Sequence, residues 1–322
     1  MLKAPECRPE FSQESPQSHT QQSYLCGSVM WKIHLSLFTV NLLYGANYSI
    51  AKEVMPAYIK PYGFVALRVI CASVLFFLVH RLWVNEKVAR KDFPRIILCA
   101  FFGVAVNQLL FLKGLDLTTP INASLMMITT PISVLLIAVL GNIEKITFSK
   151  TAGVLLAALG AFVVIYWGKH FTLDSNSFLG DIYVLINATA YAIFLVLAKP
   201  LMSKYHSLTI VKWIFLFGLL FVLPVGWNEF RAVEWNTMPL NAWLGIAYVI
   251  MGATFFAYLL NVFALTKVDP SLVGIYIYLQ PVLATMIALA LGKDELNWVK
   301  LFASALIFTG VYLASRKTNA SV

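Results

Sequence analysis

Residues 62–82 read YGFVALRVICASVLFFLVHRL, an apolar run interrupted inside by one charge, Arg68. A helix of this length spans about 30 Å, the thickness of the hydrocarbon core of a bilayer. Similar runs recur along the 322-residue chain, which is 60% hydrophobic and 12% charged, with a mean hydropathy of +0.77. Soluble domains are about a quarter charged. The sequence therefore predicts an all-α membrane protein and excludes a soluble globule.

Working outward from this run, we predict ten transmembrane helices of about 18–25 residues each. Helices are expected because a membrane-spanning segment must satisfy its own backbone hydrogen bonds. Residues 1–29 are rich in Ser, Gln and Pro and are predicted to be a disordered cytoplasmic tail, with a start of translation at Met30 rather than Met1 left open. The predicted spans are roughly 33–51, 62–82, 96–113, 119–141, 151–168, 181–199, 210–227, 241–265, 270–291 and 299–315.

Lysine and arginine are unevenly divided between the two sides that these spans define. The side of the N-terminus holds 16 of the 24, the other side holds seven, and Arg68 lies within a span. Because cytoplasmic loops carry the basic excess, both termini are predicted to be cytoplasmic. The short loops favour a multi-pass protein of a bacterial inner (plasma) membrane. The net charge of +9 is thus a topology signal, and no nucleic-acid partner is expected.

The second half of the chain repeats features of the first half at a nearly constant offset. Each half holds five predicted spans, an odd number, so the second copy enters the membrane from the opposite side. Such inverted-topology repeats are typical of transporters that alternate access to a site near the bilayer midplane. We predict repeats over 31–170 and 178–317. The matched pairs include Pro120 with Pro270, Pro131 with Pro281 and Gly160 with Gly310 at offset 150, and Tyr44 with Tyr191 and Lys52 with Lys199 at offset 147.

Several short motifs point to a known family. Tyr44-Gly45-Ala46-Asn47-Tyr48 lies in the first span, Pro61 precedes Arg68 in the second, and Gly141-Asn142-Ile143-Glu144-Lys145 follows the fourth. The second copy carries Gly292-Lys293-Asp294-Glu295, where Asp294 or Glu295 matches Glu144. Together the motifs resemble the EamA family of the drug/metabolite transporter superfamily over Trp31 to about Arg316. The resemblance implies a small-metabolite transporter, often an exporter of amino acids or related compounds.

Polar side chains inside the spans are the candidates for a substrate site, since they must line water or find partners. Residues three, four and seven apart share a helix face. Amide and tyrosine groups beside aromatic rings suit a zwitterionic or moderately polar ligand; hydrogen bonds between helices are the alternative role. The predicted substrate-binding residues are Asn41, Tyr44, Tyr48, Arg68, Asn107, Gln108, Tyr183, Asn187, Tyr191, Tyr258, Asn261, Tyr276 and Gln280.

Arg68 is the one charge well inside a predicted span, where an arginine costs about 2.5–3.5 kcal/mol at the bilayer centre. It is close enough to the outer helix end to snorkel, and contact with a substrate carboxylate or another helix is equally open. No Asp or Glu lies deep in a predicted span. Carboxylates in the middle of the membrane are the usual proton relays of coupled pumps, so this absence disfavours a strongly proton-driven pump. His34, near the cytoplasmic end of the first span, is predicted to be interfacial.

No nucleotide-binding loop, HExxH or CxxC pattern is present in the sequence. An enzyme and an ATP-driven pump are therefore disfavoured, and no cofactor or metal is expected. We predict a secondary transporter that exports a small metabolite, such as an amino acid or related compound, by alternating access. A non-transporting membrane scaffold or sensor with the same fold is the alternative, and a lipid enzyme is a weaker one. The expected partners are a small-molecule substrate and the lipid bilayer, with a homodimer left open.

Overall fold

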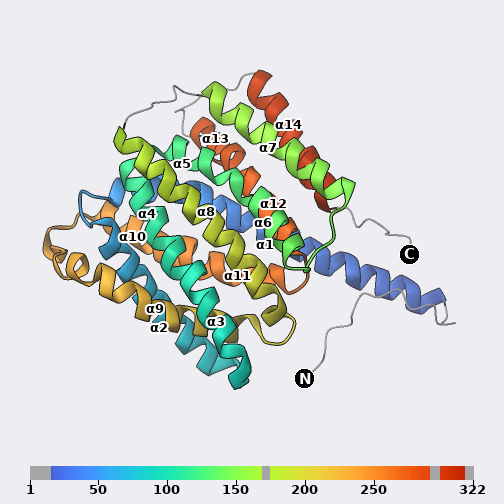
Figure 1. Cartoon of the computed structure of the whole chain (residues 1–322), viewed down its shortest axis with the longest axis horizontal. Helices are drawn as coiled ribbons and strands as arrows, with labels where there is room; N and C mark the ends of the chain where they lie inside the picture. Colours follow the sequence, from blue (N-terminus) through green and yellow to red (C-terminus); the bar gives the residue numbers. More distant parts are fainter. Residues whose placement is uncertain (1–15, 169–174, 291–297, 316–322) are drawn as a thin grey trace.

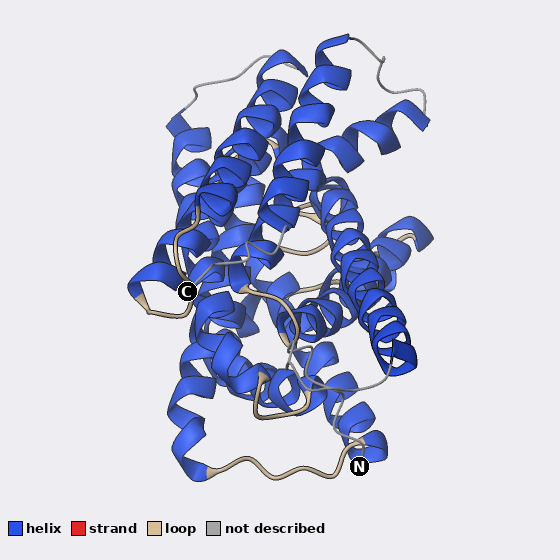
Figure 2. Cartoon of the chain, turned by 90° about the vertical axis from the view of Figure 1, so that its right-hand side faces the viewer, coloured by secondary structure: helices blue, strands red, loops and turns tan. Residues whose placement is uncertain are grey.

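The computed structural model describes residues 16–168, 175–290 and 298–315. These residues form a bundle of helices (Figure 1), and none of them lies in a β-strand (Figure 2). The predicted all-α class is therefore confirmed. Six helical stretches in the described ranges are long and apolar enough to cross a membrane: Pro61–Trp83, Arg90–Leu117, Asn122–Leu140, Phe178–Met202, Ser207–Arg231 and Leu240–Leu265. Shorter apolar helices are Phe148–Val163, Pro270–Leu283 and Leu301–Ala314.

Each of the ten predicted spans overlaps helical residues, although residue 291 lies outside the described ranges. The first half contains α1 (Pro16–Val54), α2 (Pro61–Trp83), η1 (Arg90–Asp92), α3 (Phe93–Ala100), α4 (Asn107–Leu117), α5 (Pro120–Met127), α6 (Thr129–Leu140) and α7 (Phe148–Gly168). The second half contains α8 (Ser175–Met202), α9 (Ser207–Arg231), η3 (Trp235–Thr237), α10 (Leu240–Ile250), α11 (Ala257–Leu265), α12 (Pro270–Ile275), α13 (Leu279–Ala290) and α14 (Trp298–Ser315). The division into ten spans and two repeats stays a prediction.

The first helix of the described ranges begins within the predicted N-terminal tail. Helix α1 begins at Pro16, well before Trp31, and residues 1–15 lie outside the described ranges. Proline suits the first turn of a helix because its missing N–H has no intrahelical acceptor there. Extending an existing helix is also far easier than nucleating one. A prediction from composition alone does not take account of a helix that continues backward from the first apolar span.

Two π-helical segments interrupt what we predicted as regular helices. Segment η2 (Phe101–Val106) joins α3 to α4, and η4 (Met251–Phe256) joins α10 to α11. The segments lie 150 residues apart, which is the offset of the predicted repeat. A π-helical turn inserts an extra residue and is frequent at functional sites. Gln108 and Tyr258 follow these segments closely, so the insertion sets which way both side chains face.

Prolines break two further helices. Helix α5 is separated from α6 at Ile128, and η5 (Tyr276–Tyr278) separates α12 from α13. Pro131 and Pro281 follow these breaks by three residues. Proline has no N–H to donate to the carbonyl four residues back, and its ring crowds that carbonyl. The breaks therefore fall where the proline positions require them.

Glycines allow two pairs of helices to cross closely. Helices α7 and α14 lie side by side (Figure 1), and a Cβ added at Gly153 would be 2.7 Å from the Gly310 carbonyl oxygen. Helix α2 packs against α9, where a Cβ at Gly226 would be 2.3 Å from the Tyr62 oxygen. Small residues let helix backbones approach one another in membrane proteins. Gly153 and Gly310 allow this close approach of α7 and α14.

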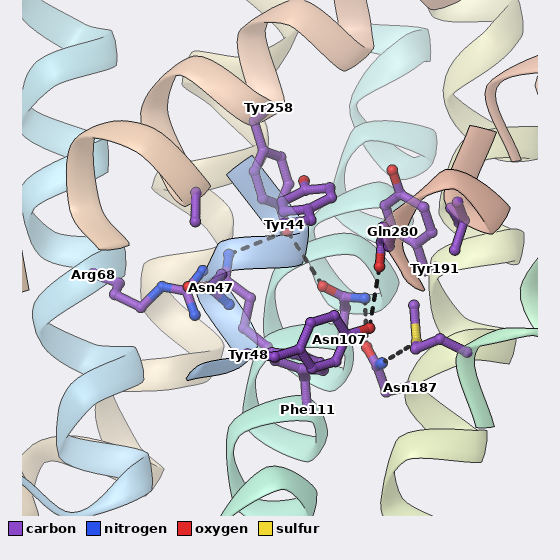
Figure 3. Close-up of a pocket in the computed structure, with 14 residues that line it drawn as sticks. Tyr44, Asn47, Tyr48, Arg68, Asn107, Phe111, Asn187, Tyr191, Tyr258 and Gln280 are labelled. Atoms are coloured by element: carbon purple, nitrogen blue, oxygen red, sulfur yellow. Dashed lines mark hydrogen bonds between the residues drawn. The ribbon is translucent and has the colours of Figure 1, made fainter. Parts of the chain in front are cut away.

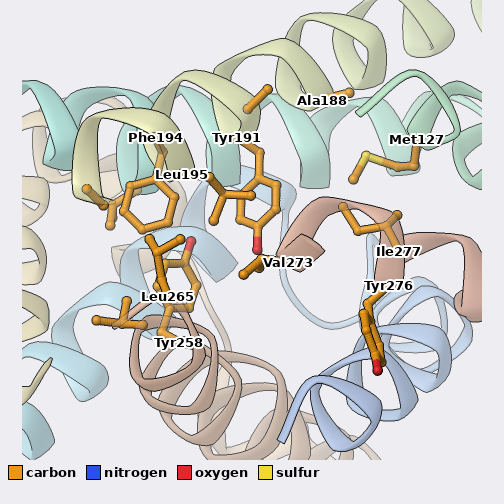
Figure 4. Close-up of a cluster of buried hydrophobic side chains, with 14 of the residues drawn as sticks. Met127, Ala188, Tyr191, Phe194, Leu195, Tyr258, Leu265, Val273, Tyr276 and Ile277 are labelled. Carbon is orange, nitrogen blue, oxygen red and sulfur yellow. The ribbon is translucent and has the colours of Figure 1, made fainter. Parts of the chain in front are cut away.

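Buried apolar side chains form a core through the bundle, and one cluster of it lies between α8 and α11. Figure 4 shows Phe194 and Leu195 of α8 facing Leu265 of α11. Tyr191 and Tyr258 border this cluster, and the rings of Phe194 and Tyr258 lie 6.3 Å apart. The aromatic rings pack with the apolar residues, while the hydroxyl groups take part in the polar contacts described next.

Candidate functional site

A cavity lies in the middle of the bundle, between helices from both halves of the chain (Figure 3). Its volume is about 60 Å³, which is large enough to hold water. Its lining residues are Tyr44, Asn47 and Tyr48 of α1, Arg68 of α2, Asn107, Gln108 and Phe111 of α4, Met127 of α5, Asn187 and Tyr191 of α8, Ala253 of η4, Tyr258 of α11, Ile277 of η5 and Gln280 of α13.

One wall of the cavity comes from α1, whose Tyr44, Asn47 and Tyr48 are three to four residues apart and so share a face. The Tyr48 hydroxyl donates to Gln280 Oε1 at 3.2 Å. Gln280 Nε2 in turn donates to Asn41 Oδ1 at 2.9 Å. These bonds tie α1 to α13, which belong to opposite halves of the chain, and leave Asn41 behind the wall.

A second polar network joins α4, α8 and α11. Asn107 Nδ2 donates to Asn187 Oδ1 at 2.6 Å. The Tyr258 hydroxyl donates to the Gly103 carbonyl oxygen at 2.6 Å and accepts from Gln108 Nε2 at 3.2 Å. Gln108 and Tyr258 are the offset-150 partners of the predicted repeat, so this contact joins equivalent positions of the two halves.

Two of the four tyrosines that line the cavity are held by one amide, that of Asn261. Asn261 Nδ2 donates to the Tyr191 hydroxyl at 2.8 Å and to the Tyr44 hydroxyl at 3.4 Å. Asn261 itself does not line the cavity. Its role in the structure is to orient two phenol groups, one from α1 and one from α8, that do line it.

Arg68 places a positive charge at the cavity, and its side chain is only 4% exposed. Arg68 Nε donates to Thr254 Oγ1 of η4 at 3.0 Å. Figure 3 shows the side chain extending from α2 toward Asn47. No Asp or Glu oxygen of the described residues lies within 4 Å of the guanidinium. The structure therefore shows contact with another helix rather than snorkelling to the membrane surface.

Three buried polar atoms at the cavity have no hydrogen-bond partner in the described part of the chain. They are Arg68 Nη1, Asn47 Oδ1 and Gln108 Oε1. Asn47 is 3% exposed and Gln108 is 2% exposed. A buried polar group without a partner costs about 1–3 kcal/mol, and more when it is charged. Water or a ligand with an acceptor and a donor would remove that cost.

The structure brings together nine of the thirteen predicted site residues as lining of the cavity: Tyr44, Tyr48, Arg68, Asn107, Gln108, Asn187, Tyr191, Tyr258 and Gln280. The other four do not line it. Asn41 and Asn261 support lining residues, as described above. The Tyr276 hydroxyl is hydrogen-bonded to His34 Nδ1 of α1. Tyr183 packs against Gly114 of α4, where an added Cβ would lie 3.2 Å from the Tyr183 Cβ.

Five lining residues were not predicted. Asn47 follows Tyr44 by three residues, so the same helix-face rule would have included it. Phe111, Met127, Ala253 and Ile277 are apolar. Apolar residues abound in every span of a membrane protein, so the sequence contains no signal that separates these four from lipid-facing neighbours.

His34 is half-buried, and its bond to Tyr276 connects α1 to η5. Its predicted position at the membrane interface stays a prediction. Elsewhere, Asp181 near the start of α8 accepts from Thr118 Oγ1 at 2.6 Å and from Asn122 Nδ2 at 3.4 Å. Both groups lie outside the cavity lining. Within the described ranges, no three His, Cys, Asp or Glu side chains are grouped so that they could hold a metal ion.

The model of the EamA-like transporter family matches residues 31–166 and 178–316, which is most of the chain. The chain belongs to the EamA family. A chain with an internal repeat would match one family model twice in this way. Family membership, together with the apolar helices, makes this EamA protein a multi-pass membrane transporter and not an enzyme.

Relatives of this EamA protein carry transporter names. An uncharacterized transporter of Archaeoglobus fulgidus is 26% identical over 81% of this chain and 90% of its own length. The uncharacterized transporter YetK of Bacillus subtilis is 24% identical over 87% of this chain and 86% of its own length. A protein of Streptantibioticus cattleyicolor named "Probable terminal-alkyne amino-acid exporter" is 26% identical over 71% and 75%. These names support a transport function without identifying the substrate of this chain.

A solved crystal structure has the same fold. It aligns with a TM-score of 0.71 at 19% identity and covers 88% of this chain and 96% of that chain. At this identity the likeness concerns the fold alone.

Proposed function

We propose that this EamA protein is a secondary transporter that exports a small metabolite, an amino acid or a related compound, by alternating access. The observation that carries the proposal is the central cavity, whose polar lining comes from helices in both halves of the chain. A cavity shared by two halves can open to either side when one half rocks against the other. The relative named as an amino-acid exporter supports the substrate class and the direction.

The proposal includes two inverted repeats over 31–170 and 178–317. Several contacts join equivalent elements, as a two-fold axis through the centre requires. The fifth helix of each repeat, α7 and α14, cross each other, and so do the second helices, α2 and α9. The π-helical segments η2 and η4 also occupy equivalent positions, 150 residues apart. These pairs support the repeat more strongly than sequence matches alone.

Two lysines give a further equivalent contact. Lys52 Nζ donates to the carbonyl oxygens of Leu115 at 2.6 Å and Asp116 at 2.7 Å, at the C-terminal end of α4. Lys199 Nζ donates to the carbonyl oxygens of Leu265 at 2.9 Å and Val268 at 2.7 Å, at the end of α11. Cations stabilise helix C-termini because the last carbonyls have no intrahelical donor. Lys52 and Lys199 are equivalent at offset 147, and the proposed topology places them on opposite sides of the membrane.

Flux in proteoliposomes tests the proposed function. Purified protein is reconstituted, and uptake of labelled amino acids and related carboxylic acids is measured with and without unlabelled solute inside. Exchange that is saturable and is stimulated by internal solute is the expected result. Export is tested in cells, where overproduction of the protein should raise the external level of the same solute. Binding without any flux would contradict transport and favour a sensor.

A further inference from the structure

The cavity carries one fixed charge, and that charge is positive. Arg68 lines it, and no Asp or Glu of the described residues does. Inside the bundle the guanidinium has a neutral partner, Thr254, and no carboxylate within 4 Å. An ion removed from water without a counter-charge is costly by several kcal/mol. The lining residues therefore leave the charge of Arg68 without a counter-charge, and a ligand of net charge −1 would supply it.

The neutral groups beside Arg68 are unpartnered acceptors. Among the described residues, Asn47 Oδ1 and Gln108 Oε1 are buried without a donor. Other amides and hydroxyls of the lining already have partners, among them Asn107 with Asn187 and Tyr48 with Gln280. An amide oxygen accepts a hydrogen bond from a hydroxyl or a neutral N–H at little cost. It supplies no charge to compensate an ammonium group that has lost its water.

We propose that the substrate binds as a monoanion, with its carboxylate on the Arg68 guanidinium and a neutral hydroxyl or amide donor at Asn47 and Gln108. The apolar part of the substrate packs against Phe111, Met127 and Ile277. The inference rests on the proposed function for its assignment of the cavity as the substrate site. It narrows the ligand class to hydroxy acids and amide-linked acids and ranks free zwitterionic amino acids below them.

Matched ligands that differ only in charge test this selection. On one carbon skeleton, 2-hydroxy-3-methylbutanoate is an anion, valine is a zwitterion and valinamide is a cation. The same trio exists as glycolate, glycine and glycinamide, and as 3-phenyllactate, phenylalanine and phenylalaninamide. Affinity is measured by calorimetry on the purified full chain at pH 7. The hydroxy acid of at least one skeleton is expected to bind about tenfold or more tightly than its amino acid, and the amide most weakly, because an unpaired ammonium must be desolvated.

A charge change at the acceptors should reverse the order. Asn47→Asp places a carboxylate beside Arg68 with almost no change in shape, and Gln108→Glu does the same at the other acceptor. Either variant is expected to bind the amino acid more tightly than the hydroxy acid. Asn241→Asp, at the exposed start of α10, is the matched control and should keep the wild-type order. Thermal unfolding of each variant shows which of them remain folded, and either acceptor variant suffices.

The outcomes separate this inference from the proposed function. If the amino acid of every skeleton binds wild-type protein as tightly as its hydroxy acid, or if no trio binds, the inference is overturned. Flux of amino acids would then leave transport standing. If the hydroxy acid binds best, and the order reverses in a folded acceptor variant, the inference is supported even where no flux is found, and only the transport proposal fails.

Discussion

At the scale of single residues, Arg68 supplies the positive charge among the described residues that line the cavity. Its side chain reaches from α2 to Thr254 on η4, so it joins elements that are far apart in sequence. Arginine offers five donors in a planar fork, while lysine offers a compact point charge. With Nε already bonded to Thr254, the outer nitrogens remain for a ligand. The guanidinium can therefore serve as an inter-helix contact and as an anion site together.

Substitution of Arg68 separates these two roles. Arg68→Gln removes the charge and is expected to lower transport by about tenfold or more, since a hydrogen bond to a charged group contributes about 1.5–3 kcal/mol. Arg68→Lys keeps the charge without the fork and should retain intermediate activity. Initial rates of flux in proteoliposomes measure both. Arg231→Gln, at the exposed end of α9, is the control and should transport as wild type. Wild-type rates for Arg68→Gln would contradict a role in the site.

At the scale of secondary-structure elements, close helix crossings hold the proposed repeats together. A Cβ added at Gly310 would lie 2.6 Å from the Gly153 carbonyl oxygen and 2.6 Å from Ala157 N. Both neighbours are backbone atoms, which cannot move aside as a flexible side chain can. A side chain here must therefore push α14 away from α7 along the whole crossing.

Gly310→Ala is accordingly expected to destabilise the protein by about 1–3 kcal/mol, the usual cost of overpacking. The control is Gly252→Ala, where the nearest atom to an added Cβ is Leu43 Cδ2 at 3.2 Å, the end of a flexible side chain. Thermal unfolding in detergent compares the two. The midpoint should fall clearly for Gly310→Ala and hardly for Gly252→Ala. Equal midpoints would show that the α7–α14 crossing is looser than the structure has it.

At the scale of the whole molecule, an ion-pair cluster joins the two halves at one end of the bundle. Lys150 Nζ at the start of α7 lies 2.9 Å from Glu144 Oε2 and 2.8 Å from Asp269 Oδ2 before α12. Glu144 Oε1 also accepts from the backbone N–H of Ser271 at 2.9 Å. The offset-150 counterpart of Asp269 is Thr119, which carries no charge. The cluster therefore lacks one of its acids at the opposite end, and the two ends are unequal.

Loss of this cluster should favour opening on its side. Lys150→Gln removes about 1 kcal/mol or more of stabilisation from the conformation closed on this side. The ratio of open to closed protein then rises about fivefold. In a variant without the four native cysteines and with Ala253→Cys in the cavity wall, labelling by an impermeant thiol reagent from the cytoplasmic side should accelerate by about that factor. Lys145→Gln, on a nearby exposed lysine, is the control. An unchanged labelling rate in Lys150→Gln would contradict the closing role.

The proposed topology places both chain ends on the cytoplasmic side. The excess of lysine and arginine on that side is the physical basis, because basic loops are retained in the cytoplasm. Reporter tags fused before Lys3 and after Lys317 should both report a cytoplasmic location in whole cells. A tag inserted in the loop at residues 232–239 should report the outside. Termini on opposite faces would remove the inverted repeat and with it the alternating-access proposal.

The sequence by itself determined the fold class, the family resemblance and most of the polar cavity lining, because apolar run length and intramembrane polarity are local properties. The tertiary structure decided which polar residues meet: Asn41 and Asn261 stand behind the cavity, and Tyr183 and Tyr276 lie elsewhere. It also added the apolar wall of Phe111, Met127, Ala253 and Ile277. Which residues reach the cavity depends on how each helix is rotated and where it crosses its neighbours. The π-helical segments and the proline breaks change that rotation by a fraction of a turn. The pattern of residue types along one helix does not record this change.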